Sequence, residues 1–325
     1  MIETVGLVKV RGQRRVVDDA YLKVAGGRVT AFLGPNGAGK SSTMRLIAGL
    51  DRPTAGTALV DGRPIGSWEH PASMLGGLLD PPAIHPRWRV HEHLRYLGAT
   101  HGLSRSRVTE VVEECGLDGF RDRRGRELSL GMRQRLGIAM AILANPANLM
   151  LDEPANGLDP QGMRWLRRLL RHYAEAGAVV LLSSHQMREV QDIADDVAVI
   201  LNGRIVTHRP IAKFLIGTDQ RTVVRTPDAD RLGPAIQRAG GRIVNEPGRL
   251  VVVGLSGDQV GRLAFEHQAQ LWELHTELAA LEDVYLDFID SELAAERVVP
   301  SSPRRALLDI HTSAPGISHA QPANN

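Results

Sequence analysis

One stretch of the chain combines glycines, a lysine and a serine at a spacing suited to binding phosphate. Residues 34–41 read Gly-Pro-Asn-Gly-Ala-Gly-Lys-Ser, which fits G-x-x-x-x-G-K-[ST] without a mismatch. The apolar run Val29–Leu33 precedes this segment, and the helical pattern Ser42–Leu50 follows it. A strand that feeds a glycine loop and then a helix N-terminus directs backbone N–H groups and a partial positive charge at an anion. This context favours a nucleoside triphosphate site over a glycine-rich turn that matches by coincidence.

The side chains of this phosphate loop predict specific contacts. Lys40 would reach the β- and γ-phosphates, and the Ser41 hydroxyl would coordinate Mg²⁺. The predicted nucleotide-binding residues of the loop are Gly34, Pro35, Asn36, Gly37, Ala38, Gly39, Lys40, Ser41 and Ser42.

Two carboxylates follow a second apolar run. Residues 149–153 read Leu-Met-Leu-Asp-Glu, a buried strand that ends in acids. Asp152 is placed to share Mg²⁺ with Ser41, and Glu153 to polarise a water for attack on the γ-phosphate. The alternative is a pair of exposed acids at a strand end, and the phosphate loop upstream argues against it.

The segment before the next helical run distinguishes among phosphate-loop enzymes. Residues 128–135 read Leu-Ser-Leu-Gly-Met-Arg-Gln-Arg and precede the helical run Leu136–Ala144. This segment resembles the signature motif of the ABC ATPases, which GTPases and nucleotide kinases lack. Ser129 and Gly131 can present a helix N-terminus to a phosphate.

The resemblance extends through the catalytic core in the same order. Asn156-Gly157-Leu158-Asp159 is similar to the D-loop of the family, and Ser183-Ser184-His185 to its switch-histidine loop. The family geometry implies that ATP is sandwiched between the phosphate loop of one copy and the signature of another. It assigns His185 to the γ-phosphate as a catalytic residue, Asp159 to the link between copies, and Ser129 with Gly131 to the γ-phosphate in trans.

The sequence departs from the family pattern at several positions. Arg11 stands where an aromatic residue usually stacks on adenine, and a planar guanidinium can also stack on a base. Asp80 replaces the usual glutamine of the Q-loop, where a carboxylate can still hold Mg²⁺ or water. In the signature, Leu130 replaces a glycine and Met132 a glutamine. The predicted metal ligands are therefore Ser41, Asp80 and Asp152, and Arg11 joins the predicted nucleotide contacts.

Three segments are expected along the chain. Residues 1–217 alternate apolar runs with helical patterns, which predicts an α/β domain with a mostly parallel sheet. The resemblance implies that this is a P-loop NTPase domain of the ABC type with a helical subdomain. Residues 218–293 read β-α-β-β-α-β-α and predict a small α+β domain, similar to a ferredoxin-like module and to the accessory domain of ABC-2-type exporter ATPases, including drug exporters. Residues 294–325 lack sustained periodicity and predict a mostly disordered tail. The strand candidates of the first segment are Val29–Leu33, Asn148–Leu151, Ala178–Ser183 and Asp196–Asn202.

Composition agrees with an ordinary globular protein of roughly two domains. The chain has 325 residues, of which 43% are hydrophobic and 23% charged, and its net charge of +2 gives no argument for nucleic acid. Cys115 is the single cysteine, which excludes an intrachain disulfide, and its apolar neighbours predict a buried thiol. Met1–Val10 shows no secretory signal, and the longest apolar run, Ala176–Ser183, is too short to span a bilayer. A cytoplasmic location is expected, peripheral on the inner face of the membrane through a partner.

These features predict the ATP-hydrolysing subunit of an ABC transporter, an exporter, with ATP and Mg²⁺ as cofactors. Its expected partners are a second copy in a head-to-tail homodimer and a separate polytopic permease, with no nucleic acid. Segment Asp80–His101, with Trp88 and Tyr96, is expected to receive a coupling helix of the permease. The competing class is a non-transport ABC ATPase acting on ribosomes or nucleic acid. Such proteins usually join two ATPase units or insert a long coiled coil, and this chain has neither, nor a basic stripe. A third interpretation gives the C-terminal domain a regulatory role. The sequence does not indicate which cargo is exported.

Overall fold

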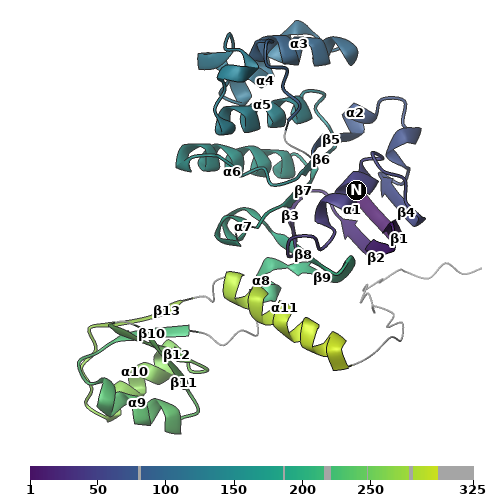
Figure 1. Ribbon diagram of the computed structural model, residues 1–325. Helices are drawn as coiled ribbons and strands as arrows, with labels where there is room; N and C mark the ends of the chain where they lie inside the picture. Colours follow the sequence, from purple (N-terminus) through teal and green to yellow (C-terminus); the bar gives the residue numbers. More distant parts are fainter. Residues whose placement is uncertain (80–81, 186, 216–220, 247, 278–280, 299–325) are drawn as a thin grey trace, which may run out of the picture. The chain divides into compact units, whose positions relative to one another are not determined.

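The computed structural model divides the chain into two compact units, Met1–Leu286 and Asp287–Asn325. Figure 1 shows its helices and strands. The predicted Mg²⁺ ligand Asp80 lies outside the described residues, and so do the predicted domain boundary at 217/218 and most of the predicted tail. The described residues are 1–79, 82–185, 187–215, 221–246, 248–277 and 281–298.

A six-stranded sheet forms the centre of the first unit, in the order β5-β6-β7-β3-β8-β9. The first five strands of this order are parallel, and β9 pairs antiparallel with β8. The four predicted strands are confirmed as the four adjacent strands β6, β7, β3 and β8. Their continuous apolar runs are typical of parallel strands that are covered on both faces. The strands are β3 (Arg28–Leu33), β5 (Leu75–Leu78), β6 (Asn148–Leu151), β7 (Val179–Ser183), β8 (Asp196–Leu201) and β9 (Arg204–Pro210).

The register of these strands brings their C-terminal ends to one edge of the sheet. Phe32 of β3 pairs with Ser183 of β7, and Leu151 of β6 pairs with Leu182 of β7. The segments that follow β3, β6 and β7 therefore leave the sheet side by side. These segments are the phosphate loop, the carboxylate pair and the switch-histidine loop.

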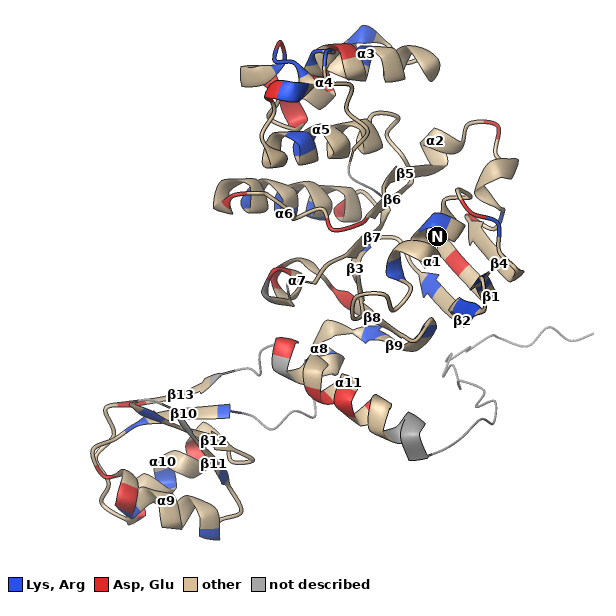
Figure 2. Ribbon diagram, viewed as in Figure 1, with Lys and Arg blue, Asp and Glu red and all other residues tan. Residues whose placement is uncertain are grey.

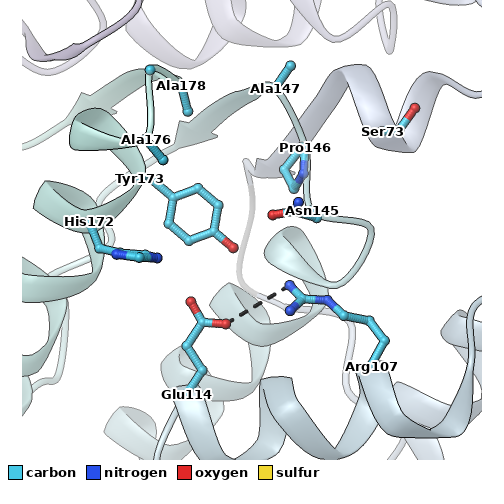
Figure 3. Close-up of a pocket in the computed structure, with 11 residues that line it drawn as sticks. Ser73, Arg107, Glu114, Asn145, Pro146, Ala147, His172, Tyr173, Ala176 and Ala178 are labelled. Carbon is cyan, nitrogen blue, oxygen red and sulfur yellow. Dashed lines mark ion pairs between the residues drawn. The ribbon is translucent and has the colours of Figure 1, made fainter.

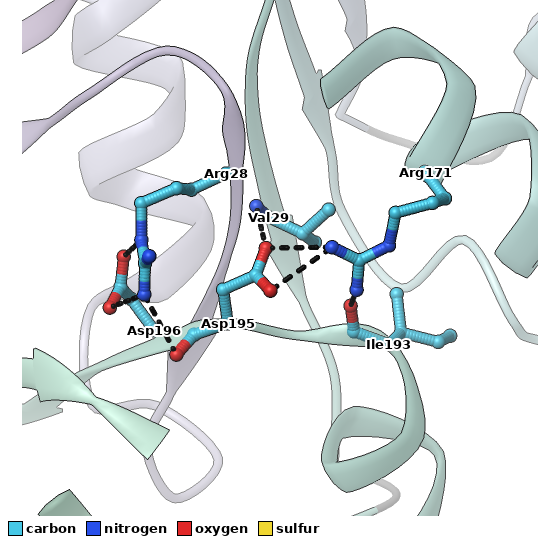
Figure 4. Close-up of polar contacts among 6 residues, drawn as sticks. All are labelled: Arg28, Val29, Arg171, Ile193, Asp195 and Asp196. Atoms are coloured by element: carbon cyan, nitrogen blue, oxygen red, sulfur yellow. Dashed lines mark hydrogen bonds and ion pairs between the residues drawn. The ribbon is translucent and has the colours of Figure 1, made fainter. Parts of the chain in front are cut away.

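Ion pairs hold the opposite edge of the sheet, where β3 and β8 begin (Figure 4). Arg28 donates to both carboxylate oxygens of Asp196, at 2.5 and 2.8 Å. Asp195 accepts from the Val29 N–H at 2.9 Å and from Arg171 at 3.0 Å. These contacts connect β3, β8 and helix α6 (Pro160–Glu175). They lie at the opposite end of the strands from the predicted catalytic residues.

A three-stranded antiparallel sheet, which the sequence patterns did not predict, lies beside the central sheet with α1 (Figure 1). Its order is β2-β1-β4, and β1 pairs with both neighbours. Ile2, Val24 and Val60 of this sheet share one hydrophobic cluster with Met44 of α1 and Phe32 of β3. Helix α1, which follows the phosphate loop, therefore packs against both the antiparallel sheet and the central sheet. The elements are β1 (Ile2–Arg11), β2 (Arg14–Val24), β4 (Ala55–Val60) and α1 (Lys40–Ile47).

Helices α3, α4 and α5 are inserted between β5 and β6, as the predicted helical subdomain requires. Helix α5 begins at Leu130, ahead of the predicted start at Leu136, because the Ser129 hydroxyl accepts from the Met132 N–H and caps the helix. The thiol of Cys115, just after α4, is buried as predicted. The remaining helices of this part are α2 (Pro71–Met74), α3 (Val90–Thr100), α4 (Arg105–Glu114), α5 (Leu130–Ile142), α7 (Met187–Ile193) and α8 (Ile211–Leu215).

The C-terminal module has the strand order β11-β12-β10-β13, and every neighbouring pair is antiparallel. With the element order β-α-β-β-α-β, this is the ferredoxin-like topology that the sequence predicted. Helices α9 and α10 cover one face of the sheet through Leu232, Ile236 and Val260. Helix α11 continues to Val298, past the predicted end at Leu293. The elements are β10 (Arg221–Arg225), α9 (Ala229–Arg238), β11 (Arg242–Glu246), β12 (Arg249–Val253), α10 (Gly257–Glu266), β13 (Glu273–Glu277) and α11 (Leu281–Val298).

The central strand β7 supplies a test of the core. Leu181 is fully buried at the middle of this strand, between β3 and β6. We expect Leu181→Ala to lower the free energy of unfolding by about 2–5 kcal/mol, because the cavity can collapse only partly. Urea denaturation followed by circular dichroism measures the change. Leu50→Ala, at a position 58% exposed, is the control and should stay within about 0.5 kcal/mol of wild type; equal losses for both variants would contradict the placement of β7.

Candidate nucleotide-binding site

The phosphate loop follows β3 and can only be built with glycine at two of its positions. Gly39 adopts φ +114°, and a Cβ there would lie 2.5 Å from the Val16 carbonyl oxygen. A Cβ on Gly34 would lie 2.4 Å from the Ile200 carbonyl oxygen. Helix α1 begins directly after Gly39 with no side-chain cap and no acidic residue in its first turn. Its first N–H groups are therefore available to an anion.

Lys40 lies over this loop. Its side chain is largely buried, and the ammonium donates to the carbonyl oxygens of Gly34 at 2.6 Å and Pro35 at 3.3 Å. Burial lowers the pKa of Lys40, while the nearby charges of Glu153 and Asp152 partly oppose that shift. The structure thus brings the loop lysine and the two predicted carboxylates into one electrostatic cluster.

A buried serine connects the two carboxylate residues. The Ser183 hydroxyl, at the end of β7, donates to the Asp152 carboxylate in a short hydrogen bond. The same hydroxyl oxygen accepts from the Glu153 N–H at 2.9 Å. Ser183 has no exposed surface. The ends of β6 and β7 are therefore joined at Ser183, two residues before the predicted switch histidine His185.

The two predicted catalytic side chains, Glu153 and His185, are in contact. Nδ1 of His185 lies 2.7 Å from a carboxylate oxygen of Glu153. The glutamate side chain is 25% exposed and the imidazole 56%. Glu189 of α7 lies near both, and burial raises its pKa, while the His185 charge opposes the shift. The pair combines an oriented carboxylate with a ring that faces solvent.

The predicted trans contacts form a second group on the same chain. Ser129 caps α5, and Asp159 caps α6 by accepting from the Gly162 N–H at 2.7 Å. A Cβ on Gly131 would lie 2.7 Å from the Gly157 carbonyl oxygen, so the signature packs against the D-loop. Within the described ranges, Ser129 and Gly131 make no hydrogen bond to the phosphate loop.

The predicted base contact, Arg11, is paired with a carboxylate. Its guanidinium donates to Asp51 at 2.6 Å. Arg14, its cross-strand partner in the β1–β2 hairpin, reaches the Gly37 carbonyl oxygen of the phosphate loop at 3.5 Å. Figure 2 shows basic residues on β2 beside α1. Sequence analysis missed Arg14; its position two residues after the hairpin glycine Gly12 was the available signal.

Gln134 was also missed. It lies on α5, is almost fully buried, and donates from its amide to the Glu153 carbonyl oxygen at 3.1 Å. Its place within the segment 128–135 that resembles the signature was the only signal in the sequence, because nothing local indicates which carbonyl a buried glutamine will reach.

The donor set fits Mg²⁺ held together with nucleotide. Ser41 and Asp152 offer oxygen atoms, and Mg²⁺ usually takes one or two protein oxygens with phosphates and waters. Among the residues that the structure describes, no group of three or more His, Cys, Asp or Glu could hold a metal by itself. This pattern suits a cation that arrives with its triphosphate.

A separate cavity of about 410 Å³ lies at the other edge of the sheet (Figure 3). Ala147 and Ala178 in its wall immediately precede β6 and β7, whereas the phosphate loop and carboxylates follow the strand ends. Arg107 and Glu114 face each other across it at 4.0 Å. This cavity is therefore distinct from the nucleotide site.

Comparison with known proteins agrees with this geometry. The family model described as "ABC transporter" matches residues 17–156, and a domain of unknown function, DUF8746, matches residues 220–282. The lantibiotic transport ATP-binding protein SrtF of Streptococcus pyogenes is 32% identical over 210 residues, covering 64% of this chain and 90% of that protein. The Nod factor export ATP-binding protein I of Cupriavidus metallidurans is 33% identical over 302 residues, covering 88% and 96%. The daunorubicin/doxorubicin resistance ATP-binding protein DrrA of Streptomyces peucetius is 38% identical over 222 residues, covering 63% and 64%.

Solved structures agree as to the fold. The ATP-binding subunit of an ABC transporter superposes with a TM-score of 0.61 at 26% identity, covering 66% of this chain and 91% of that one. A dimeric, post-hydrolysis structure of the ATP-binding cassette MJ0796 gives a TM-score of 0.58 at 21% identity, covering 65% and 99%.

The fold and site define an ATP-binding cassette, a P-loop ATPase with a parallel-rich sheet. The chain belongs to the ABC transporter family, as an ATP-binding and ATP-hydrolysing subunit. No helix in the described part of the chain is long and apolar enough to cross a membrane.

Proposed function

We propose that this subunit powers export through a separate membrane permease. The observation that carries the proposal is the cluster of Lys40, Asp152, Glu153 and His185 at one sheet edge. Relatives along most of its length are named for lantibiotic transport and Nod factor export. Nucleotide hydrolysis at this edge would supply the work.

The proposed chemistry assigns one task to each group. The phosphate loop and Lys40 bind the β- and γ-phosphates, while Ser41 and Asp152, with Asp80 outside the described residues, hold Mg²⁺. When bound there with the triphosphate, Mg²⁺ would supply neutralisation of the charge on the phosphate oxygens. Glu153 accepts a proton from the attacking water, and His185 orients that carboxylate and contacts the γ-phosphate. Arg11 stays a proposed contact for the base.

The arrangement supports a head-to-tail homodimer. Ser129 and Leu130, the latter 63% exposed, stand at the α5 N-terminus, and Ser129 makes no hydrogen bond to the loop of its own chain. A second copy would present this terminus to the γ-phosphate, with Asp159 near the join. We assign the cassette to residues 1–217, the accessory domain to 218–293 and a tail to 294–325.

An apolar groove supports the permease contact. It has a volume of about 430 Å³ and lies among α2, β5 and α5, with Leu50, Ala72 and Met140 in its wall. In the predicted receiving segment, the rings of Trp88 and Tyr96 pack edge to face with their centroids 5.2 Å apart, and Tyr96 is 60% exposed. An amphipathic helix of the permease would bury its apolar face here. This contact would hold the subunit at the cytoplasmic face of the membrane.

A pull-down tests the proposal. Tagged Glu153→Gln protein with ATP should recover a polytopic membrane protein from detergent-solubilised host membranes. Adding Ala72→Asp should cut that recovery by roughly tenfold or more, because a charge would be desolvated in the groove. Thr109→Asp, on the exposed surface of α4, is the matched control and should retain recovery. Ribosomal proteins or nucleic acid in place of a membrane protein would favour the non-transport class, and no specific partner would contradict the export proposal.

A further inference from the structure

The backbone of Glu153 is held in an unusual conformation. Its φ is +50°, a left-handed value that costs energy in a residue with a side chain. Such a conformation persists only where its surroundings over-determine it. The contacts made by the backbone N–H and carbonyl of Glu153 therefore decide where its carboxylate points.

Two buried side chains from different elements hold that residue at both ends. The Ser183 hydroxyl of β7 accepts from its N–H at 2.9 Å, and the Gln134 amide of α5 donates to its carbonyl oxygen at 3.1 Å. Ser183 is fully buried and Gln134 is 7% exposed. Neither contact is a sheet or helix hydrogen bond, so removal of one leaves the ladders of β6 and β7 intact.

The two clamps differ in what they are attached to. Ser183 belongs to the central sheet, whereas Gln134 lies on the helix that Ser129 caps and that packs at Gly131 against Gly157. A displacement of α5 is therefore transmitted to the Glu153 carbonyl through one amide. The side-chain carboxylate of Glu153 contacts His185.

We propose that Gln134 is a positioning residue that makes the orientation of Glu153 depend on the position of α5. The inference rests on the proposed role of Glu153 toward the attacking water. Without the amide, the Glu153 carbonyl keeps only the hydrogen bond from the Asn156 N–H, at 3.2 Å, and the left-handed backbone can relax. A carboxylate displaced by about 1 Å slows the reaction by as much as 10²-fold while leaving nucleotide binding alone.

The first test separates turnover from binding. Gln134→Met keeps length and shape but has no N–H, and Gln134→Asn keeps the amide but is one methylene short. Both should lower kcat by roughly tenfold to a hundredfold, with the KM for ATP, the Kd for a non-hydrolysable ATP analogue and the Tm close to wild type. Arg135→Met is the matched control, because Arg135 donates to the Cys115 carbonyl oxygen at the same 3.1 Å from the same helix. It should keep kcat.

The second test asks whether Gln134 acts through Glu153. Residues that act as a unit are non-additive in their effects on rate. In the Glu153→Gln background, Gln134→Met should therefore leave the residual single-turnover rate unchanged. An equal fold-loss in both backgrounds, or a wild-type kcat for Gln134→Met and Gln134→Asn alike, would overturn the inference. If Glu153→Gln itself keeps wild-type turnover, the proposed role of Glu153 fails instead.

Discussion

Glu153→Gln is expected to slow ATP hydrolysis by about 10²–10⁴-fold, the range that general-base catalysis supplies. The amide has the shape of the carboxylate and can keep a polar contact with His185. In the wild-type protein, Nδ1 of His185 lies 2.7 Å from a carboxylate oxygen of Glu153. The amide cannot accept a proton from the attacking water. The rate of phosphate release at saturating Mg²⁺ and ATP measures the effect, and ATP affinity should stay close to wild type.

The same variant should accumulate an ATP-bound dimer, visible by size-exclusion chromatography with and without ATP. In the proposed mechanism, ATP binding joins two copies of the chain and hydrolysis separates them. Slow hydrolysis therefore prolongs the dimeric state. Glu189→Gln provides the control, because this nearby glutamate interacts with His185 but does not follow β6. It should keep turnover within severalfold of wild type. A persistently monomeric Glu153→Gln protein with normal turnover would refute the assignment.

The close approach of these groups was predictable because the strands are parallel and apolar on both faces. Parallel strands place their C-terminal ends at one edge, so the phosphate loop, Asp152 and His185 had to converge once β3, β6 and β7 were neighbours. Strand β6 has the bounds that the pattern indicated. The ferredoxin-like order of the C-terminal module was predictable because most of its connections carry a glycine or proline, such as Gly240-Gly241 after α9 and Gly254 after β12.

Other features depend on contacts that no local pattern encodes. The antiparallel sheet of β1, β2 and β4 forms from segments separated by α1, and its irregular register blurs the expected alternation. Arg14 contacts the phosphate loop, whereas Arg11 forms an ion pair with Asp51, which lies 40 residues further along the chain. Similarly, the carbonyl that Gln134 reaches is fixed by how α5 packs on β6, which is a tertiary property.

Lys40→Ala is expected to abolish measurable hydrolysis and to weaken ATP binding by roughly 10- to 150-fold, the equivalent of about 1.5–3 kcal/mol for a hydrogen bond to a charged group. The ammonium lies on the loop carbonyls of Gly34 and Pro35, within the field of Asp152 and Glu153. Without it, the loop keeps its N–H groups but loses the point charge on the phosphates. Full activity in this variant would refute the phosphate-loop assignment.

The stability of the same variant separates loss of function from loss of fold. Burial lowers the pKa of Lys40, so the folded protein disfavours its charged form. Removing the ammonium should therefore leave the Tm without nucleotide unchanged or higher. The rise in Tm that ATP gives the wild type should shrink, because stabilisation by a ligand follows its affinity. Lys40→Arg keeps the charge, but a longer planar guanidinium does not fit a site only 8% exposed. It should lose hydrolysis as well, which would show that the geometry of the ammonium matters beyond its charge.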